Sequence, residues 1–256
     1  MAKGTIAAQL YTVRDSMSTP EEIASSLKKV AKAGYRAVEM AGLGPLTAQQ
    51  WKDLLDKNGL TVCASHTGMD RLQSDFDAVV AEHELWGAKQ VNIPSMPAQY
   101  REGGEQGFLN FAAAADDLGA KLRAAGLRLG YHNHSFEFVR FGKKTGLQLL
   151  LENTDPANLM SQIDTYWVQH GGGDPMAWIR LVKGRMPILH VKDMVIADGG
   201  QVYAEVGEGN LNWPAIMEAS SFAGVEYFVV EQDRCRRDPF ESLAMSWANL
   251  HALGLD

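Results

Sequence analysis

One junction recurs along this chain: a helical segment ends in glycine, and an apolar strand begins two or three residues later. The glycines of this junction are Gly34, Gly59, Gly87, Gly126 and Gly224. Glycine is favoured just past a helix end because it enters the left-handed backbone conformation without a Cβ penalty. Helices and strands must therefore alternate along the chain, which leaves few folds open.

The starts of the helices carry matching signals. The segment from Thr19 to Glu22 supplies an N-cap hydroxyl, a first-turn proline and a carboxylate three residues after the cap. Similar signals stand at Thr47, Asp174 and Asp238. With apolar residues at helical spacing, they predict helices near residues 20–33, 47–57, 71–86, 105–125, 144–152, 175–183, 212–220 and 239–252.

Strands are predicted between these helices, near residues 5–11, 36–40, 60–66, 89–93, 127–133, 159–164, 187–192 and 226–231. Eight strands that alternate with eight helices, strand first, predict an α/β fold of the (β/α)8 TIM barrel type, and 256 residues is a usual length for one. A doubly wound open sheet is the alternative, but it usually has fewer strands. No linker or low-complexity tract interrupts the chain, so we expect one domain spanning residues 1–256.

The net negative charge of the chain argues against nucleic acids and anionic membranes as partners. The formal net charge is -7 and no run of Lys or Arg exceeds a pair, whereas nucleic acids and anionic membranes require concentrated positive charge. We therefore expect no nucleic acid and no membrane partner. The N-terminal segment is too short and too polar for a signal peptide, and Cys63 and Cys235 cannot form a disulfide framework. We expect a cytoplasmic protein.

Each predicted strand has a polar residue at or near its C-terminal end, where packing alone would favour Val or Ile. The active site of a (β/α)8 barrel lies at the C-terminal ends of its strands. Burying a polar group without a partner costs about 1 to 3 kcal/mol, so a ring of polar strand ends indicates function. The ring consists of Gln9, Glu39, His66, Asn92, His132, Asp164, His190 and Glu231.

Four consecutive strand ends carry residues that bind metals: His132, Asp164, His190 and Glu231. Mixed imidazole and carboxylate ligands suit divalent ions such as Mn, Co or Zn. Considered singly, each residue is more often a hydrogen-bonded core or rim residue than a ligand, but together they predict a divalent metal site. His132 and His134 share one face of their strand because side chains alternate with period two.

Two residues of this ring and two residues near it are predicted to bind substrate, each with a structural role as the alternative: Glu39 and His66, and Trp167 and Lys192. Lys192 shares a strand face with His190 and could bind a substrate hydroxyl or phosphate, or else pair with Asp193 or Glu208. Trp167 could stack on a sugar or fill the rim. The long segment 194–211 predicts a small hairpin, and such loops are lids or subunit contacts, so a homo-oligomer stays open.

Several motifs along almost the whole chain are specific as a set: Gln9 to Asp15, Gly34 to Glu39, Tyr131 to Phe138, Asp164 to Trp167, Gly172 to Pro175, His190 to Asp193, Val206 to Gly209 and Glu231 to Asp233. On these motifs the chain resembles the sugar phosphate isomerase/epimerase family of xylose isomerase-like TIM barrels. That group also contains inosose dehydratase and the barrel endonucleases of abasic-site repair. The resemblance implies a divalent metal cofactor (Mn, Co, Zn or Mg) held by Glu, Asp, His and Glu. In this chain His132 stands where many members have the first Glu, with Glu137 as the alternative ligand.

The resemblance also implies the reaction. An enzyme of this group removes a proton next to the carbonyl of a small-molecule carbohydrate, while the metal stabilises the enediolate. His132, His134 and Glu231 are the expected proton-transfer groups. Return of the proton gives isomerisation or epimerisation of a keto-sugar or sugar phosphate. Loss of a β-substituent gives dehydration of an inosose or elimination from a 3-keto-glycoside. Abasic-site cleavage, which the charge opposes, and a non-catalytic sugar-binding barrel also stay open.

Overall fold

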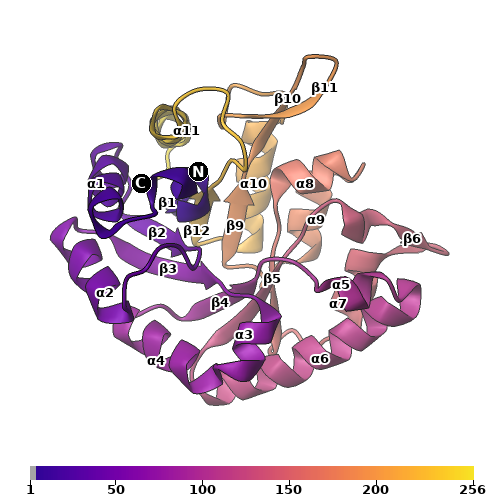
Figure 1. The fold of residues 1–256 in the computed structure, drawn as a ribbon. Helices are drawn as coiled ribbons and strands as arrows, with labels where there is room; N and C mark the ends of the chain where they lie inside the picture. The colour runs from indigo at the N-terminus through magenta and orange to yellow at the C-terminus, as the bar shows by residue number, and fades with distance from the viewer. Residues whose placement is uncertain (1–3) are drawn as a thin grey trace.

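Eight parallel strands form the centre of the fold, which a computed structural model describes for residues 4–256 (Figure 1). The strands are β1 (Thr5–Gln9), β2 (Ala37–Met40), β3 (Thr61–His66), β4 (Gln90–Ile93), β5 (Arg128–His132), β8 (Leu159–Gln162), β9 (Ile188–Val191) and β12 (Tyr227–Val230). Their order in the sheet is β8-β5-β4-β3-β2-β1-β12-β9. A bridge between Asp164 and His190 joins the two ends of the sheet, so the barrel is nearly closed. The predicted (β/α)8 TIM barrel is confirmed.

Helices surround the barrel (Figure 1). They are α1 (Pro20–Lys32), α2 (Ala48–Lys57), α3 (Met69–Ser74), α4 (Phe76–Trp86), α6 (Gly104–Ala124), α7 (Gly146–Glu152), α9 (Pro175–Leu181), α10 (Trp213–Ala223) and α11 (Pro239–Ala252). The predicted helix 71–86 is in fact two helices that break at Asp75, whose φ of -123° and ψ of 36° lie outside the helical region. Ser74 and Asp75 favour the break because both are weak helix formers.

The local signals explain these boundaries. The side chains of Thr19 and Thr47 accept hydrogen bonds from the third residue of α1 and α2, and both helices have complete capping boxes. Asp174 and Asp238 accept from first-turn amides of α9 and α11. All five junction glycines have a positive φ. The chain therefore turns from helix to strand where glycine permits it.

Short elements at the C-terminal ends of the strands were not predicted, apart from one hairpin. They are η1 (Leu10–Ser16), α5 (Ala98–Arg101), η2 (Phe136–Phe138), β6 (Arg140–Phe141), β7 (Lys144–Thr145) and α8 (Thr165–His170). The predicted hairpin is confirmed as β10 (Asp193–Ala197) paired with β11 (Gly200–Ala204), and it projects from the barrel in Figure 1. Within the part of the chain that the structure describes, no helix is long and apolar enough to span a membrane.

The barrel interior has two layers. Small or medium apolar residues, among them Ala7, Ala37, Ile188 and Val229, fill the layer nearer the N-terminal ends of the strands. Residues two positions further along the same strands face the same interior, and they belong to the predicted polar ring. A larger apolar core lies between the strands and the helices. The apolar layer thus supports a polar layer at the C-terminal ends.

Gly130 in β5 shows how tightly this interior is filled. A Cβ atom at this position would lie 1.9 Å from Asn92 Oδ1 and 2.9 Å from Gln90 Nε2. We expect Gly130→Ala to lower the free energy of unfolding in urea by about 2 kcal/mol, because overpacking forces neighbours out of place. Gly200→Ala is the matched control, since among the described residues no atom lies within 4 Å of its added Cβ. Equal stability of the two variants would contradict such tight packing at Gly130.

Candidate active site at the C-terminal ends of the strands

The predicted polar ring forms one layer of the barrel. Seven of its eight residues are buried, and His66 is partly buried. His132, Asp164, His190 and Glu231 each offer a ligand atom, and these atoms lie within 4.8 Å of one another. The barrel brings together residues that are up to 99 positions apart in sequence because neighbouring strand ends are only about 5 Å apart.

The distances within this group suit a shared cation. His190 Nδ1 lies 3.2 Å from Glu231 Oε2 and 3.9 Å from Asp164 Oδ2, and His132 Nε2 lies 3.9 Å from the same Asp164 oxygen. Ligands about 2.1 Å from a common ion stand about 3 to 4 Å apart. Among residues 4–256, Asp164 Oδ2 has no hydrogen-bond partner. The Lys192 ammonium, 3.1 Å away, is an ion-pair partner of this oxygen rather than an aligned hydrogen-bond donor. Imidazole and carboxylate atoms at these distances fit a divalent metal.

Glu39 lies at the centre of the layer and is fully buried. Its Oε1 accepts hydrogen bonds from Asn92 Nδ2 and Gln162 Nε2, both at 2.8 Å. Its Oε2 accepts from Gln9 Nε2 at 2.7 Å and lies 2.5 Å from His190 Nε2. Burial opposes ionisation, but the charges of His66 and His190 outweigh it and hold the pKa of Glu39 at about 2.

The contacts of Glu39 match the structural role that the sequence left open for it. Both of its oxygens are occupied by protein groups, whereas a substrate ligand would need a free one. The bond to His190 Nε2 turns His190 Nδ1 toward Asp164 and Glu231. A carboxylate behind a histidine is the usual way in which a metal-binding imidazole is oriented.

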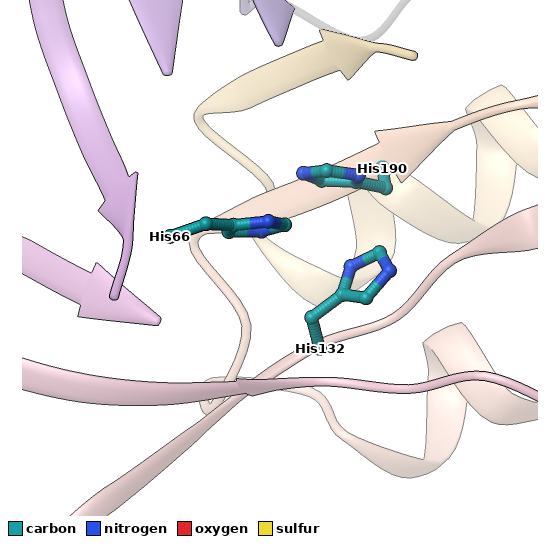
Figure 2. A group of neighbouring side chains, drawn as sticks. All are labelled: His66, His132 and His190. Carbon is teal, nitrogen blue, oxygen red and sulfur yellow. The ribbon is translucent and has the colours of Figure 1, made fainter. Parts of the chain in front are cut away.

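Three imidazoles, those of His66, His132 and His190, lie close together at the ends of their strands, as Figure 2 shows. The ring of His66 stacks on that of His190 with centroids 5.1 Å apart, and His132 lies 5.0 Å from His66. His66 Nε2 is 2.8 Å from Gln162 Oε1. The nitrogens of the three rings also lie within 4.8 Å of one another, so they form a second ligand group that shares two residues with the first.

A cavity of about 390 Å³ opens beside these rings. It is lined by Tyr11, Ala41, His66, Gly68, Pro94, Ser95, His132, His134, Glu231 and Asp233. Four residues predicted from the sequence therefore face one space: His66, His132, His134 and Glu231. A cavity with few, convergent polar groups is the usual form of a small-molecule site.

His134 is the imidazole on the outer side of the group. Its ring lies 5.1 Å from the rings of both His132 and Trp167. In the described part of the chain, its Nδ1 has no hydrogen-bond partner. Burial and the charge of Lys192 lower the pKa of His134 to about 4. The ring is therefore neutral at pH 7 and able to accept a proton.

Lys192 has partners other than the predicted ones. It is 1% exposed, and its Nζ lies 2.8 Å from Glu231 Oε2, 3.1 Å from Asp164 Oδ2 and 2.8 Å from Asp233 Oδ2. The alternative pairing with Asp193 or Glu208 is wrong. Asp193 instead accepts hydrogen bonds from backbone amides of the loop that follows the β10–β11 hairpin and from Nε1 of Trp213, the first residue of α10.

Trp167 lies in helix α8 rather than on a loop. Its backbone N–H donates to Asp164 Oδ1 at 2.9 Å, which leaves the other Asp164 oxygen toward the ligand group. The indole is partly buried and lies 5.7 Å from Lys192 Nζ, while its Nε1 has no partner within residues 4–256. This position permits contact with a bound ligand.

Glu137, the alternative fifth-strand ligand, lies outside the ligand group. It is buried in η2, where its Oε1 accepts from the Tyr131 hydroxyl at 2.5 Å and its Oε2 from the backbone N–H of His134 at 2.9 Å. Tyr131 points out of the barrel toward helix α6, against Phe111. His132 is thus the fifth-strand residue that faces Asp164 and His190, and Glu137 holds the loop that carries His134.

Among the site residues that sequence reasoning missed are Gln162, Asp233 and Tyr203, as well as the cavity residues Tyr11 and Ser95. Gln162 precedes Asp164 by two positions and Asp233 follows Glu231 by two, so the period-two rule that selected the ring could have found both. Tyr203 in β11 lies 5.6 Å from Lys192 Nζ. No local pattern indicates it, because the fold-back of the hairpin puts it there.

The chain is similar to several known proteins over most of its length. The family model described as xylose isomerase-like TIM barrel matches residues 27–245. Inosose dehydratase from Lacticaseibacillus casei is 20% identical to this chain in an alignment that covers 84% of each of the two chains. The structure of a sugar phosphate isomerase/epimerase from Parabacteroides distasonis is similar with a TM-score of 0.79 and 26% identity, covering 99% of this chain and 94% of that one. A D-allulose 3-epimerase from a Methylomonas species has a TM-score of 0.69 at 13% identity over 98% of both chains, a likeness of fold alone.

The burial of Glu137 predicts a pH dependence of stability. Burial raises the pKa of Glu137 from 4.5 to about 7, so its contribution to stability is fully present below pH 4.5 and is lost as the pH rises through 7. The amide in Glu137→Gln can accept from His134 N and donate to the Tyr131 hydroxyl without ionising. Between pH 4.5 and 8 the variant should therefore gain on the order of 3 kcal/mol relative to the wild type. Urea unfolding at a series of pH values measures this gain.

The control is Glu218→Gln, which removes a carboxylate whose side chain is 75% exposed. Its stability should follow that of the wild type across the same pH range. Parallel curves for Glu137→Gln and the wild type would show that Glu137 ionises as freely in the folded chain as in the unfolded one, and would refute the raised pKa.

Proposed function

The chain belongs to the xylose isomerase-like TIM barrel family, and from this premise we propose that it is a metal-dependent carbohydrate isomerase or epimerase. The enzyme would remove a proton next to the carbonyl of a keto-sugar or sugar phosphate. Known members of the family are enzymes, among them epimerases and dehydratases. The observation that carries the proposal is a buried group of four ligand atoms beside a cavity that a neutral imidazole also lines.

His132, Asp164, His190 and Glu231 would hold the divalent metal, for which Mn, Co, Zn and Mg are the candidates. When bound, the ion supplies a Lewis acid that polarises a carbonyl oxygen and a neighbouring hydroxyl. The protein prepares its ligands in advance. Glu39 fixes the tautomer and the direction of His190, and the Trp167 amide fixes Asp164.

Two groups on the cavity wall can transfer the proton. His134 is neutral at pH 7 and has a free ring nitrogen among the described residues, so it can accept one. Burial opposes the ionisation of Glu231, but the charges of Lys192 and His190 outweigh it and lower its pKa well below the usual range. Glu231 is therefore a second, ionised acceptor. Removal of a proton by one group and its return by the other, or to another carbon, gives epimerisation or isomerisation.

The remaining cavity residues suit a polyol. Tyr11, Ser95 and Asp233 present hydroxyl and carboxylate groups that can exchange hydrogen bonds with sugar hydroxyls. His66, also on the wall, and the partly buried Trp167 offer flat faces for a sugar ring. Substrate binding by His66, Trp167 and Lys192 stays a prediction.

Dehydration or β-elimination is the second candidate, and one observation favours it. The rings of His132 and His134 lie 5.1 Å apart at the end of one strand, so an imidazole that accepts the proton from carbon can then donate it to the departing hydroxyl, which leaves as water. An inosose or a 3-keto-glycoside would be the substrate. The similarity to inosose dehydratase agrees with this alternative.

Incubation of the metal-loaded protein in D2O with keto-sugars, inososes and 3-keto-glycosides tests both candidates. Deuterium uptake beside the carbonyl with isomeric products would identify an isomerase or epimerase, and growth of an enone absorbance would identify elimination. If no substrate of this panel exchanges its proton with Mn, Co, Zn or Mg present, proton abstraction is refuted for these classes.

Two variants separate proton transfer from metal binding. We expect His134→Gln to slow deuterium exchange by about 10² to 10⁴, the usual contribution of a general base, and to leave Mn²⁺ affinity unchanged. Asp164→Asn should abolish both exchange and Mn²⁺ binding. His251→Gln, on the exposed side of α11, is the control and should alter neither quantity. Full exchange activity in His134→Gln would remove His134 from the proposed mechanism.

A further inference from the structure

The ammonium of Lys192 occupies an unusual position within the proposed metal site. Its Nζ lies 2.8 Å from Glu231 Oε2 and 3.1 Å from Asp164 Oδ2, and these two carboxylates are half of the proposed ligand group. The Glu231 oxygen that it contacts also lies 3.2 Å from His190 Nδ1. The Asp164 oxygen accepts no aligned hydrogen bond in the described chain, so the ion pair with Lys192 is what compensates its charge. Lys192 therefore contacts the same oxygens that a metal would use.

Two cations cannot share these oxygens without cost. Like charges a few ångströms apart repel strongly in a buried site, where little water screens them. A buried carboxylate in turn needs a cation or donors beside it, because its desolvation is otherwise uncompensated. Lys192 supplies that cation to Asp164 and Glu231 in the metal-free protein. A metal that binds both carboxylates must take over this role from Lys192.

A third carboxylate, that of Asp233, can remain paired with the Lys192 ammonium after a metal has displaced it from Asp164 and Glu231. Asp233 Oδ2 lies 2.8 Å from Lys192 Nζ, but Asp233 is not part of the ligand group. Its side chain is 28% exposed at the cavity wall, and its backbone carbonyl accepts from Arg14 Nη2 at 2.8 Å. Lys192 has a flexible four-carbon stem, so its ammonium can leave two carboxylates and keep the third.

Resting on the proposed metal site, we propose that Lys192 is a built-in cation that competes with the divalent metal for Asp164 and Glu231, and that Asp233 retains its ammonium when the metal binds. Lys192 then lowers metal affinity while it keeps the metal-free site folded. Asp233 is a positioning residue that acts on the metal through Lys192. The rings of Trp167 and Tyr203, 5.7 and 5.6 Å from Nζ, flank the ammonium and add to its local stabilisation.

Mn²⁺ titration calorimetry of four proteins tests the proposal: the wild type, Lys192→Met, Asp233→Asn and the double variant. We expect Lys192→Met to bind Mn²⁺ at least about tenfold more tightly, because the repelling charge is gone. Asp233→Asn should bind about tenfold more weakly, because the ammonium stays on Asp164 and Glu231. In the Lys192→Met background, the Asp233→Asn effect should fall below about threefold, since the two residues act as one unit.

Lys183→Met is the matched control, because Lys183 is exposed and its Nζ lies against the Phe222 ring. Its Mn²⁺ affinity should equal that of the wild type. If Lys192→Met leaves three carboxylates too crowded to fold, Lys192→Gln purified with Mn²⁺ replaces it, and the Mn²⁺ dissociation rate followed by electron paramagnetic resonance gives the same comparison.

The outcomes separate this inference from the proposed function. Metal binding by Lys192→Met that is equal to or weaker than that of the wild type overturns the inference and leaves the metal site intact. An Asp233→Asn effect of the same size with and without Lys192 also overturns it, because Asp233 would then act on the metal directly. Absence of Mn²⁺, Co²⁺ and Zn²⁺ binding in every variant overturns the metal site itself, and the inference with it. If Mn²⁺ binds to Lys192→Met but not to the wild type, the inference is supported.

Discussion

A single buried carboxylate, that of Glu39, connects the parts on which the site depends. Its neighbours come from four other strands: Gln9 from β1, Asn92 from β4, Gln162 from β8 and His190 from β9. An ionised carboxylate in a dry interior is costly unless donors surround it. The closed barrel supplies these donors from all sides, and the carboxylate in turn holds the strand ends in one arrangement. The orientation of His190, and with it the ligand group, follows from this bond.

The layer above Glu39 is a balance of charges. Asp164, Glu231 and Asp233 face Lys192 and His190, so each carboxylate has a cation beside it. Burial opposes protonation of His190, but the charges of Glu39 and Glu231 outweigh it and raise the pKa of His190 to about 10. Burial raises the pKa of Asp164 to about 6 despite the nearby Lys192. Each buried charge of this layer therefore has an opposite charge beside it, and the proposed exchange of Lys192 for a metal would preserve that pairing.

Much of the fold was predictable because its signals are local. Capping residues and left-handed glycines act within one turn of a helix, and all eight barrel strands lie within the predicted ranges. The ring of polar strand ends was predictable because alternation along a strand is a property of its backbone. The break at Asp75 and helix α8 were missed, since short helices depend on contacts that no sequence window contains. The sequence correctly predicted that Lys192 shares a strand face with His190, but its predicted ion-pair partners, Asp193 and Glu208, were wrong.

The sequence by itself determined the class of fold, the faces of the strands and the set of residues able to do chemistry, because these depend on neighbours a few positions apart. Only the tertiary structure decided which of these residues meet. Glu39 and Gln162 are 123 positions apart, and Lys192 and Asp233 are 41 apart. His132 faces the ligand group while Glu137 turns to Tyr131, although both follow the same strand. The closure of the sheet determines these contacts, because it sets the distances between side chains on different strands, and no local sequence pattern does so.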